Sequence, residues 1–330
     1  MRAPAHITRL PPGPSPGKLA AMRIATFNVQ NLRLRTGPDG PRLDGARDAD
    51  DPGDAGPAAA ALDPADRRLT AAVLARADAD IVVLQEVFDR ATLDHFHDAF
   101  LLPAGLAPYP HRIAMRGNDG HGRNLAVLSR HGFDRVTSHA DAPAAAFGLA
   151  PLPGRDPAQP VFRRDLLMLE IGDLVLFACH LKAPWPDPAA AWPARRQEAQ
   201  ALRRVIEGRF ADPAAALWLI LGDLNEPHEE PLGDRAAAPI LPPFSVDLLN
   251  RLPETERWTY ATPEGALHAR PDAMLASAAL ARRWPAARPQ VLRAGLGREA
   301  GAAGPALPGT GWHRPHASDH AALVIDLPGP

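Results

Sequence analysis

The sequence contains very little cysteine and very little lysine. Cys179 is the only cysteine among the 330 residues, and Lys18 and Lys182 are the only lysines. A single cysteine excludes an intramolecular disulfide, a secreted disulfide framework and a metal cluster held by thiolates. We therefore expect a cytoplasmic protein. We attribute the excess of arginine over lysine to genome composition and not to function.

Long apolar runs are also missing. No stretch reaches the roughly 18 consecutive apolar residues that a membrane-spanning helix needs. The N-terminal segment MRAPAHITRLPPGPSPGKLAAM is interrupted by proline and glycine, so it lacks the apolar centre of a signal peptide. We expect residues 1–21 to be a disordered leader. The sequence leaves open whether translation starts at Met1 or at Met22.

Three common phosphate-binding and nucleophile motifs are absent as well. The sequence has no GxxxxGK[ST], no GxGxxG after an apolar run and no GxSxG, which argues against an NTPase, a dinucleotide-binding enzyme and a serine hydrolase. The formal net charge of -2 argues against a strongly basic nucleic-acid binder but leaves room for a local basic groove.

The residues that are present predict one large domain. With 46% hydrophobic residues the chain can bury a substantial core. Short β-branched or apolar runs predict many strands, and apolar residues at helical spacing predict two helices. The expected strands are 23–29, 80–87, 125–129, 166–171, 174–180, 217–225, 272–277 and 321–327, and the expected helices are 67–77 and 195–210. Because strands outnumber helices and many are fully apolar, we expect an α+β protein in which two sheets pack together and helices flank them.

One segment breaks this pattern. Residues 36–64 are rich in Gly, Pro, Asp and Ala and contain almost no large apolar side chains. Such a composition offers little apolar burial to offset the entropy of ordering, so we expect a flexible acidic loop there. No linker divides the rest, and we expect residues 22–330 to form a single, monomeric domain.

Polar residues with chemical potential fall at the ends or starts of the predicted apolar strands. One such residue alone is best explained as the exit of a buried strand, but strand ends converge at one edge of a sheet. Acids, amides and imidazoles in this mixture therefore predict a site, and its members are Asn28, Glu86, His180, Asp223, Asn225, Asp319 and His320.

The segment LGDLNEP places two of these residues two apart on an extended chain. Asp223 and Asn225 then project to the same side. A carboxylate can hold the attacking water in ester hydrolysis, and it can deprotonate that water if burial or a neighbouring anion raises its pKa. Asn225 would either hold a phosphate oxygen or fix the aspartate. The structural alternative is a turn capped by Asp and Asn.

The segment ASDHAALVIDL places an acid and an imidazole directly before the last strand. His180 supplies a second imidazole, and two imidazoles can share proton donation and charge stabilisation. Asp272, which opens a strand, would orient an imidazole and keep it protonated. Glu86, Asp319 and Asn28 offer the oxygen ligands that suit Mg²⁺, or alternatively Mn²⁺. The His-rich stretch 313–320 and the pair His95/His97 suggest zinc less well, because they lack the short ligand spacing of zinc sites.

In this order, the motifs resemble the endonuclease/exonuclease/phosphatase (DNase I-like) superfamily. RIATFNVQNL is similar to its opening strand, DIVVLQEV to the strand with the metal-binding Glu, ACHLKAP to the His strand, and LILGDLNEP to the Asp-x-Asn motif. RPDAMLAS and SDHAALVI are similar to its last two motifs, and TY at 259–260 to its usual pre-strand pair. The likeness spans about residues 22–327. It implies a four-layered α/β/β/α sandwich with two packed mixed sheets.

The resemblance also implies a role for each matched residue. Glu86 and Asp319 would bind the metal with help from Asn28, Asp223 would activate water, and Asn225 would hold the phosphate. The roles of the remaining matched residues are transition-state stabilisation by His180 and His320, orientation of His320 by Asp272, and contact with the scissile phosphate by Arg164 and Asn124. Two departures, Ala321–Ala322 after Ser-Asp-His and the 36–64 insert, remove no chemical group.

The substrate is less defined than the reaction. ARPDAML lacks the Trp/Cys-Asp-Arg run usual in inositol phosphatases, and NVQNL, HLKA and RRQEAQ are most similar to bacterial nuclease-like members. We therefore expect a nucleic-acid phosphodiester as substrate, with a lipid or small-molecule phosphate as the alternative. A non-catalytic binding protein on the same fold is the third possibility, since fold does not fix function. The outer face of the second predicted helix could contact a nucleic-acid backbone, but we interpret it as solvated; its arginines are Arg195, Arg196, Arg203 and Arg204.

Overall fold

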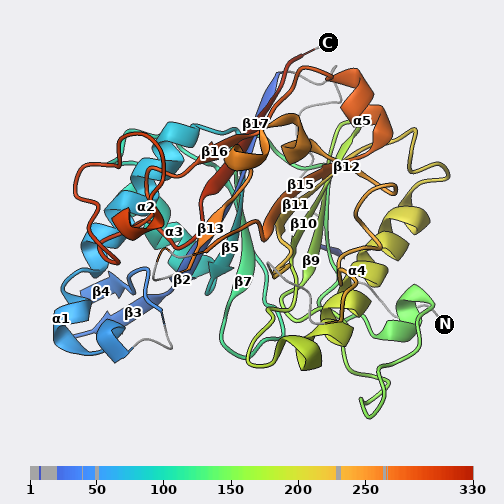
Figure 1. Cartoon of the computed structure of the whole chain (residues 1–330), viewed down its shortest axis with the longest axis horizontal. Helices are drawn as coiled ribbons and strands as arrows, with labels where there is room; N and C mark the ends of the chain where they lie inside the picture. The colour runs from blue at the N-terminus through green and yellow to red at the C-terminus, as the bar shows by residue number, and fades with distance from the viewer. Residues whose placement is uncertain are drawn as a thin grey trace.

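The computed structural model describes residues 7–8, 21–38, 40–48, 52–227, 232–262, 265 and 267–329. Within these residues two large β-sheets pack face to face, and helices cover their outer faces (Figure 1). This confirms the predicted α/β/β/α sandwich. Of the expected disordered leader, residues 1–6 and 9–20 lie outside the described part, while β1 (Ile7–Thr8) pairs with β8 (Arg135–Ser138).

The strand order of the two sheets positions the site. In the described residues, the first sheet runs β16 (Gln290–Leu292), β17 (Ala322–Leu327), β2 (Met22–Leu32), β5 (Ile81–Val87), β7 (Asn124–Ser129) and β6 (His111–Ala114). The second runs β1, β8, β9 (Leu166–Ile171), β10 (Leu174–His180), β11 (Leu217–Asp223), β15 (Asp272–Ala276) and β12 (Val246–Asp247).

Each sheet has one parallel pair at its centre. β2 and β5 are parallel and are joined through α2 (Asp63–Ala77), and β10 and β11 are parallel and are joined through α4 (Pro188–Arg209). The other paired neighbours within the described sheets are antiparallel. Parallel neighbours end at the same edge, so each sheet delivers two strand ends to one place.

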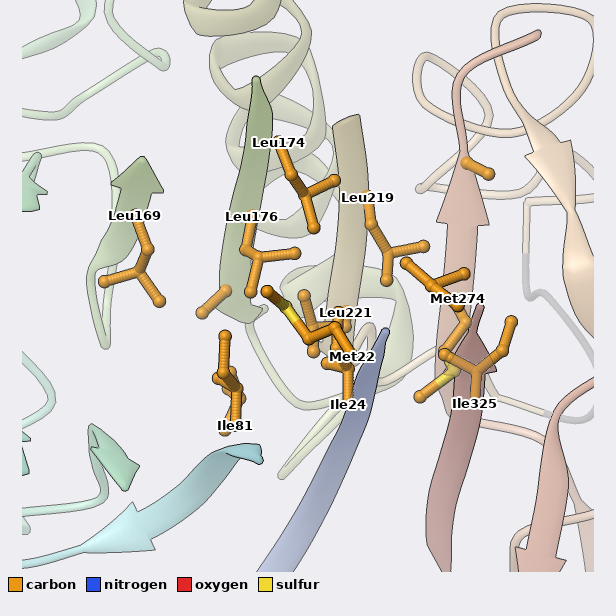
Figure 2. Close-up of a cluster of buried hydrophobic side chains, with 14 of the residues drawn as sticks. Met22, Ile24, Ile81, Leu169, Leu174, Leu176, Leu219, Leu221, Met274 and Ile325 are labelled. Carbon is orange, nitrogen blue, oxygen red and sulfur yellow. The ribbon is translucent and has the colours of Figure 1, made fainter. Parts of the chain in front are cut away.

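The interface between the sheets is apolar because side chains alternate along each strand. On β10, Leu174 and Leu176 point to the other sheet, whereas Val175 and Phe177 point to the outer layer. Figure 2 shows Met22 and Ile24 of the first sheet packing toward leucines of the second. The complete burial of these side chains makes the two-sheet core the main apolar contribution to stability.

Helices complete the outer layers. α2 and α3 (Arg90–Phe96) pack on the first sheet through residues such as Leu74 and Phe96. α4 packs on the second sheet through Leu202 and Ile206. α5 (Ala278–Arg283) packs instead on the core between the sheets through Leu280.

Both predicted helices begin earlier than their apolar spacing suggests. α2 starts at Asp63 with proline in its first turn, and α4 starts at Pro188 after Asp187 caps its N-terminus. Proline fits the first helical turn because its missing N–H has no intrahelical partner there. The strands β9 and β10 run over the predicted residues 166–171 and 174–180.

The 36–64 insert has more regular structure than its composition predicts. It contains the hairpin β3 (Leu34–Gly37) and β4 (Gly40–Leu43), η1 (Pro52–Asp54) and α1 (Gly56–Ala60). In Figure 1 these elements form a lobe beside α2. Short regular elements thus occupy part of the segment for which a flexible acidic loop is expected, and buried polar contacts made by distant residues replace the missing apolar burial.

Arg67 of α2 makes the central contact of this lobe. Its guanidinium is buried and donates to the carbonyls of Val29 and Gln30 on β2 and of Asp44 and Gly45 in the insert, at 2.6–2.7 Å. Arg314 adds ion pairs to three insert-side carboxylates, those of Asp54, Asp63 and Asp66. Hydrogen bonds with a charged partner are about twice as strong as neutral ones, so they fix the insert to the first strand.

Short elements connect the larger ones. They are η2 (His97–Leu101), η3 (Ala144–Phe147), η4 (Leu248–Arg251), η5 (Glu254–Glu256), η6 (Arg298–Ala300) and the paired strands β13 (Tyr260–Ala261) and β14 (His268–Ala269). Within the described residues, no helix has both the length and the apolar character needed to cross a membrane.

Candidate active site

Three neighbouring strands of the second sheet place predicted site residues in one row. His180 at the end of β10 is in register with Asp223 at the end of β11, and Asp223 is in register with Asp272 at the start of β15. The Nε2 atom of His180 lies 3.4 Å from Oδ2 of Asp223. All three side chains are at most 2% exposed.

Gly222 allows this row to form. Its φ is +137°, which non-glycine residues rarely adopt, and a Cβ atom there would lie 1.9 Å from the carbonyl oxygen of Cys179. The backbones of β10 and β11 thus approach too closely for any side chain at this position. Glycine is therefore required directly before Asp223.

His320 faces the same row from the other sheet. Its Nδ1 lies 2.8 Å from Oδ2 of Asp272, and its Nε2 lies 3.9 Å from Oδ2 of Asp223. Thr259 donates its hydroxyl to the same oxygen of Asp272 at 2.6 Å, and the Tyr260 ring packs against the His320 ring. The predicted contact between Asp272 and His320 is thus present, and Thr259 and Tyr260 hold its two members.

The first sheet brings the predicted metal ligands to this edge. Asn28 on β2 donates its side-chain amide to Oδ2 of Asp223 at 3.1 Å. Glu86 on β5 accepts the Asn31 backbone N–H at 2.9 Å, and the Ser318 hydroxyl donates to Asp319 at 3.2 Å. Asn28, Glu86 and Asp319 all line one cavity of about 360 Å³ together with His180, Asp223, Asn225 and His320.

The backbone around this cavity is unusually strained. Positive φ angles occur at four residues that line it, which are Gln30, Asn31, Glu86 and Asn225. Residues other than glycine adopt this region at a cost, and such residues concentrate at functional sites. At Asn225 the strained turn lets its backbone N–H donate to Oδ1 of Asp223 at 2.7 Å, while its side chain donates to the Leu181 carbonyl. Of the two predicted roles of Asn225, the structure thus shows contact with the aspartate.

Charges around the cavity shift the two imidazoles in opposite directions. Burial lowers the pKa of His320, but the carboxylates of Asp272, Asp319 and Asp223 together raise that pKa well above its usual value. Burial, Arg164 and the positive His320 lower the pKa of His180 well below its usual value. At neutral pH the site therefore holds one cationic and one neutral imidazole.

Asp223 is the carboxylate whose pKa favours proton acceptance. Burial raises its pKa, and the Asp272 charge raises it further, while His320 and the donors from Asn225 and Asn28 oppose the shift. A raised pKa makes a carboxylate a better base at neutral pH. The condition that the sequence argument set for Asp223 as a base is met.

Glu86 and Asp319 fit a divalent cation. Burial raises the pKa of Asp319 and the Glu86 charge adds to that rise, so the two carboxylates repel each other across the cavity. Among the described residues, Asp319 has no Arg or Lys within ion-pair distance, and the nearest arginine nitrogen to Glu86, on Arg123, is 3.9 Å away. Two partly buried carboxylates that face each other are costly without a cation between them, and their oxygen atoms suit Mg²⁺ or Mn²⁺.

A second group, Asp223, Asp272 and His320, has ligand atoms within 4.8 Å of one another. Metal binding there is disfavoured because Oδ2 of Asp272 already accepts hydrogen bonds from Thr259 and His320. The bonds of this group are those of an oriented imidazole, and the oxygen-only ligands of the first sheet remain the better site for a hard cation.

The two predicted phosphate contacts have different outcomes. Arg164 lines the cavity, is 5% exposed, and donates to the Leu181 carbonyl while its Nε makes no hydrogen bond within the described structure. Asn124 does not line the cavity, because its amide accepts the Gly117 N–H and donates to the Phe88 carbonyl. This placement argues against Asn124 as a phosphate contact. The preceding residue, Arg123, lines the cavity instead.

A buried charge cluster on α4 was missed by the sequence argument. Glu198 accepts the backbone N–H of Arg163 at 2.8 Å and of Lys182 at 2.5 Å. It thereby connects the segment before Arg164 to the segment after His180. Arg195, expected on a solvated face, is fully buried; it lies 3.8 Å from Glu226 and donates to the Lys182 carbonyl. Both Arg195 and Glu198 belong to the motif RRQEAQ, but the sequence alone does not show which face of this helix packs on the sheet.

The fold and the site define a class of protein, the hydrolases of phosphoester bonds that are built on two packed sheets. The model of the Endonuclease/Exonuclease/phosphatase family matches residues 25–320, and the chain belongs to this family. A search of curated protein sequences finds no match.

Solved structures share the fold at low sequence identity. Truncated TDP2 from Caenorhabditis elegans is 18% identical, with a TM-score of 0.55 over 93% of this chain and 96% of that one. An endonuclease/exonuclease/phosphatase from Beutenbergia cavernae is 20% identical, with a TM-score of 0.56 over 94% of this chain and 72% of that one. TDP2 from D. rerio, complexed with a single-strand DNA product, is 18% identical, with a TM-score of 0.53 over 93% and 98%.

Proposed function

We propose that this chain is a divalent-metal-dependent phosphodiesterase that hydrolyses nucleic acid, with Asp223 as the group that activates water. The observation that carries the proposal is the row of His180, Asp223 and Asp272, which lies within reach of the cationic His320. An acid–base group and a fixed positive charge then surround one cavity with the carboxylates of Glu86 and Asp319.

Glu86 and Asp319 would hold Mg²⁺, or alternatively Mn²⁺, with Asn28 beside them. When bound, the cation neutralises phosphate charge and polarises the ester. Asn28 connects this half of the cavity to the other half because its amide also donates to Asp223.

The protein side chains supply the rest of the chemistry. Asp223 orients the attacking water and accepts its proton, since burial raises the carboxylate pKa. His320, kept protonated by Asp272, stabilises charge on the phosphate oxygens. His180 stays neutral and donates a hydrogen bond, while Asn225 and Arg164, which also line the cavity, fix the phosphate.

Nucleic acid is the favoured substrate class. The D. rerio protein of the same fold is described in complex with a single-strand DNA product. A lipid or small-molecule phosphate is the alternative, and a non-catalytic role would be expected to remove Glu86, Asp223 or His320, all of which this chain keeps.

A substrate panel tests the proposal. Wild type and Asp223→Asn are offered plasmid DNA, single-stranded DNA, an abasic oligonucleotide, RNA, bis-p-nitrophenyl phosphate and phosphoinositides, with Mg²⁺ or with EDTA. We expect metal-dependent cleavage of nucleic acid and a loss of about 10²–10⁴-fold in kcat for Asp223→Asn. Equal turnover by both proteins would refute the mechanism. Cleavage of phosphoinositides alone would show that the substrate is a lipid phosphate and not nucleic acid.

A further inference from the structure

A second cavity opens beside the active site. It has a volume of about 1190 Å³ and lies between the β3–β4 hairpin, α1 and the segment around Gly122. Asn31, Arg47, Asp48, Glu86 and Arg123 line both this cavity and the active-site cavity, so the two are continuous. We call this second cavity the hairpin groove. A nucleic-acid chain whose scissile phosphate lies in the active-site cavity would therefore extend into it.

The hairpin groove is rich in arginine although the whole chain has a net charge of -2. Its cationic side chains are Arg33, Arg35, Arg42, Arg47 and Arg123. Two of its carboxylates already have arginine partners, because Asp44 pairs with Arg35 and Asp54 pairs with Arg314. A third lining carboxylate, Glu86, lies 3.9 Å from Arg123, and Arg47 pairs with Asp63. Among the described residues, the arginines of the lining without a carboxylate at ion-pair distance are therefore Arg33 and Arg42.

Two arginines oppose each other directly on the hairpin. Arg35 of β3 and Arg42 of β4 are cross-strand partners, and like charges at such positions are destabilising. Arg35 is compensated by Asp44 at 2.8 Å, whereas Arg42 is exposed and has no carboxylate within ion-pair distance among the described residues. An anion in the groove would neutralise the repulsion that the hairpin otherwise retains.

Arg33 is positioned to stack and not only to pair. Its guanidinium lies 4.0 Å from the centroid of the Phe88 ring. Phe88 is itself fixed: its carbonyl accepts from Asn124, and a Cβ on Gly122 would lie 2.1 Å from its ring. With one face on Phe88, the guanidinium plane can receive an unpaired base on the other, a contact frequent in single-strand recognition.

The groove wall is rigidly connected to the catalytic strand. Arg67 joins the carbonyls at the end of β2 to those at the base of the hairpin. Ordering therefore does not have to be supplied by the ligand, which lowers the cost of binding.

From these observations we infer that the hairpin groove binds the single-stranded nucleic-acid segment next to the scissile phosphate, with Arg42 contacting the backbone and Arg33 stacking on a base. The inference rests on the proposed function, since it adds a binding path to the same site. It assigns the 36–64 insert a role in substrate affinity and none in the chemical step.

Direct binding and turnover separate this inference from the proposed function. Anisotropy of a fluorescein-labelled oligothymidylate in EDTA measures binding without cleavage, for wild type, Arg42→Glu, Arg33→Ala and the control Arg68→Glu. Arg68 lies exposed on α2 outside the groove. Because Arg68→Glu is the same substitution as Arg42→Glu, the two variants have the same net charge. Thermal unfolding checks that all four proteins are folded.

We expect Arg42→Glu and Arg33→Ala to weaken oligothymidylate binding about tenfold, and Arg42→Glu to lower the slope of log Kd against log salt by about 0.7. Hydrolysis of bis-p-nitrophenyl phosphate, which has no neighbouring nucleotides, should stay within about twofold of wild type, because neither Arg42 nor Arg33 takes part in the proposed chemical step. Binding by Arg68→Glu should stay near that of wild type.

Equal weakening by Arg42→Glu and Arg68→Glu would overturn the inference, because it would show general electrostatics. An equal loss for a duplex of the same length would overturn the assignment to single strands. If wild type cleaved no substrate, yet binding still depended on Arg42 and Arg33, the groove would stand and the proposed reaction would fail.

Discussion

The two sheets repeat one arrangement with different chemistry at its ends. β17, β2, β5 and β7 correspond in order and direction to β9, β10, β11 and β15, and in each sheet a helix joins the central parallel pair. The order along the chain differs only because β16 and β17 come last, whereas β8 and β9 precede β10. The comparison separates what the fold requires from what the reaction requires.

The joining helices hold the loops of the site by the same means. Asp66 of α2 accepts the backbone N–H groups of Ala46, after β2, and of His316, before β17. Glu198 of α4 accepts those of Lys182, after β10, and of Arg163, before β9. Buried N–H groups need partners, so one buried acid per sheet connects a strand exit to a neighbouring strand entry.

The strand ends themselves differ. Near the end of the second parallel strand, the first sheet has Glu86 and the second has Asp223. On the first parallel strand they have Asn28, where the regular pairing of β2 with β5 is interrupted, and His180, where β10 ends. One half thus offers oxygen ligands, and the other offers an acid–base pair. In the proposed mechanism, metal binding and proton transfer are thus divided between equivalent positions of the two sheets.

The largest expected effect tests that division. Asp223→Asn should lower kcat by about 10²–10⁴-fold without recovery at high Mg²⁺, because the lost group handles the proton. Glu86→Gln should raise the Mg²⁺ concentration for half-maximal activity by about 10–100-fold, with activity recovering at high Mg²⁺. A magnesium titration of both variants measures this. Similar Mg²⁺ responses of the two variants would contradict the assignment of metal binding to Glu86 and of proton transfer to Asp223.

Stability is most sensitive where the second sheet is closest packed. Gly222→Ala places a methyl group against the Cys179 carbonyl at a φ of +137°. We expect a loss of about 2–5 kcal/mol in the free energy of unfolding from strain and overpacking. Urea unfolding measures it, with Gly208→Ala as control, because a Cβ at Gly208 meets no atom within 4 Å. A neutral Gly222→Ala would contradict the close approach of β10 and β11.

The two halves should respond to pH with opposite sign. Burial raises the pKa of Asp165, before β9, to about 6, so its stabilising contribution is present below about pH 4 and lost as pH rises through about 6. Burial lowers the pKa of His316, before β17, to about 3, so its contribution is lost as pH falls below about 6.5.

Two variants isolate these contributions. Asp165→Asn should raise the free energy of unfolding by about 1–2 kcal/mol at neutral pH, since the buried charge is gone. His316→Gln should remove a similar loss of about 1–2 kcal/mol that wild type shows between neutral pH and about pH 5. Urea unfolding at both pH values tests this, with His131→Gln at an exposed site as control. Parallel pH curves for wild type and His316→Gln would exclude the histidine effect.

The smallest expected effect concerns the loop connection of α4. Glu198→Gln replaces one acceptor oxygen with a donor, so the N–H of either Arg163 or Lys182 loses its partner. We expect kcat to fall about 3–10-fold and KM to rise, because Arg164 and His180 follow the two loops. Glu207→Gln, on the exposed face of α4, is the matched control. A fall in stability with unchanged kcat and KM would make Glu198 purely structural.

Strands and their polar ends were predictable because both are local features of the sequence. The apolar runs located β9 and β10, and the contact of Asp272 with His320 is the one that the family resemblance implied. The insert was not predictable, because Arg67 and Arg314, which lie outside it, stabilise it by polar contacts. Arg123 was missed beside Asn124, since neighbouring residues at a strand start point to opposite sides and only the register shows which side faces the cavity.

The pairing of β17 with β2 makes the order of synthesis matter. Met22 and Leu327 are register partners, so one edge of β2 stays unpaired until β17 has been made, although β5 on its other side follows early in the chain. Asp319 and His320 arrive with that last strand. A nascent chain that ends before residue 319 would therefore expose the edge of β2 that later pairs with β17 and would lack the side chains of Asp319 and His320, so the proposed cleavage could begin only after this strand has been made.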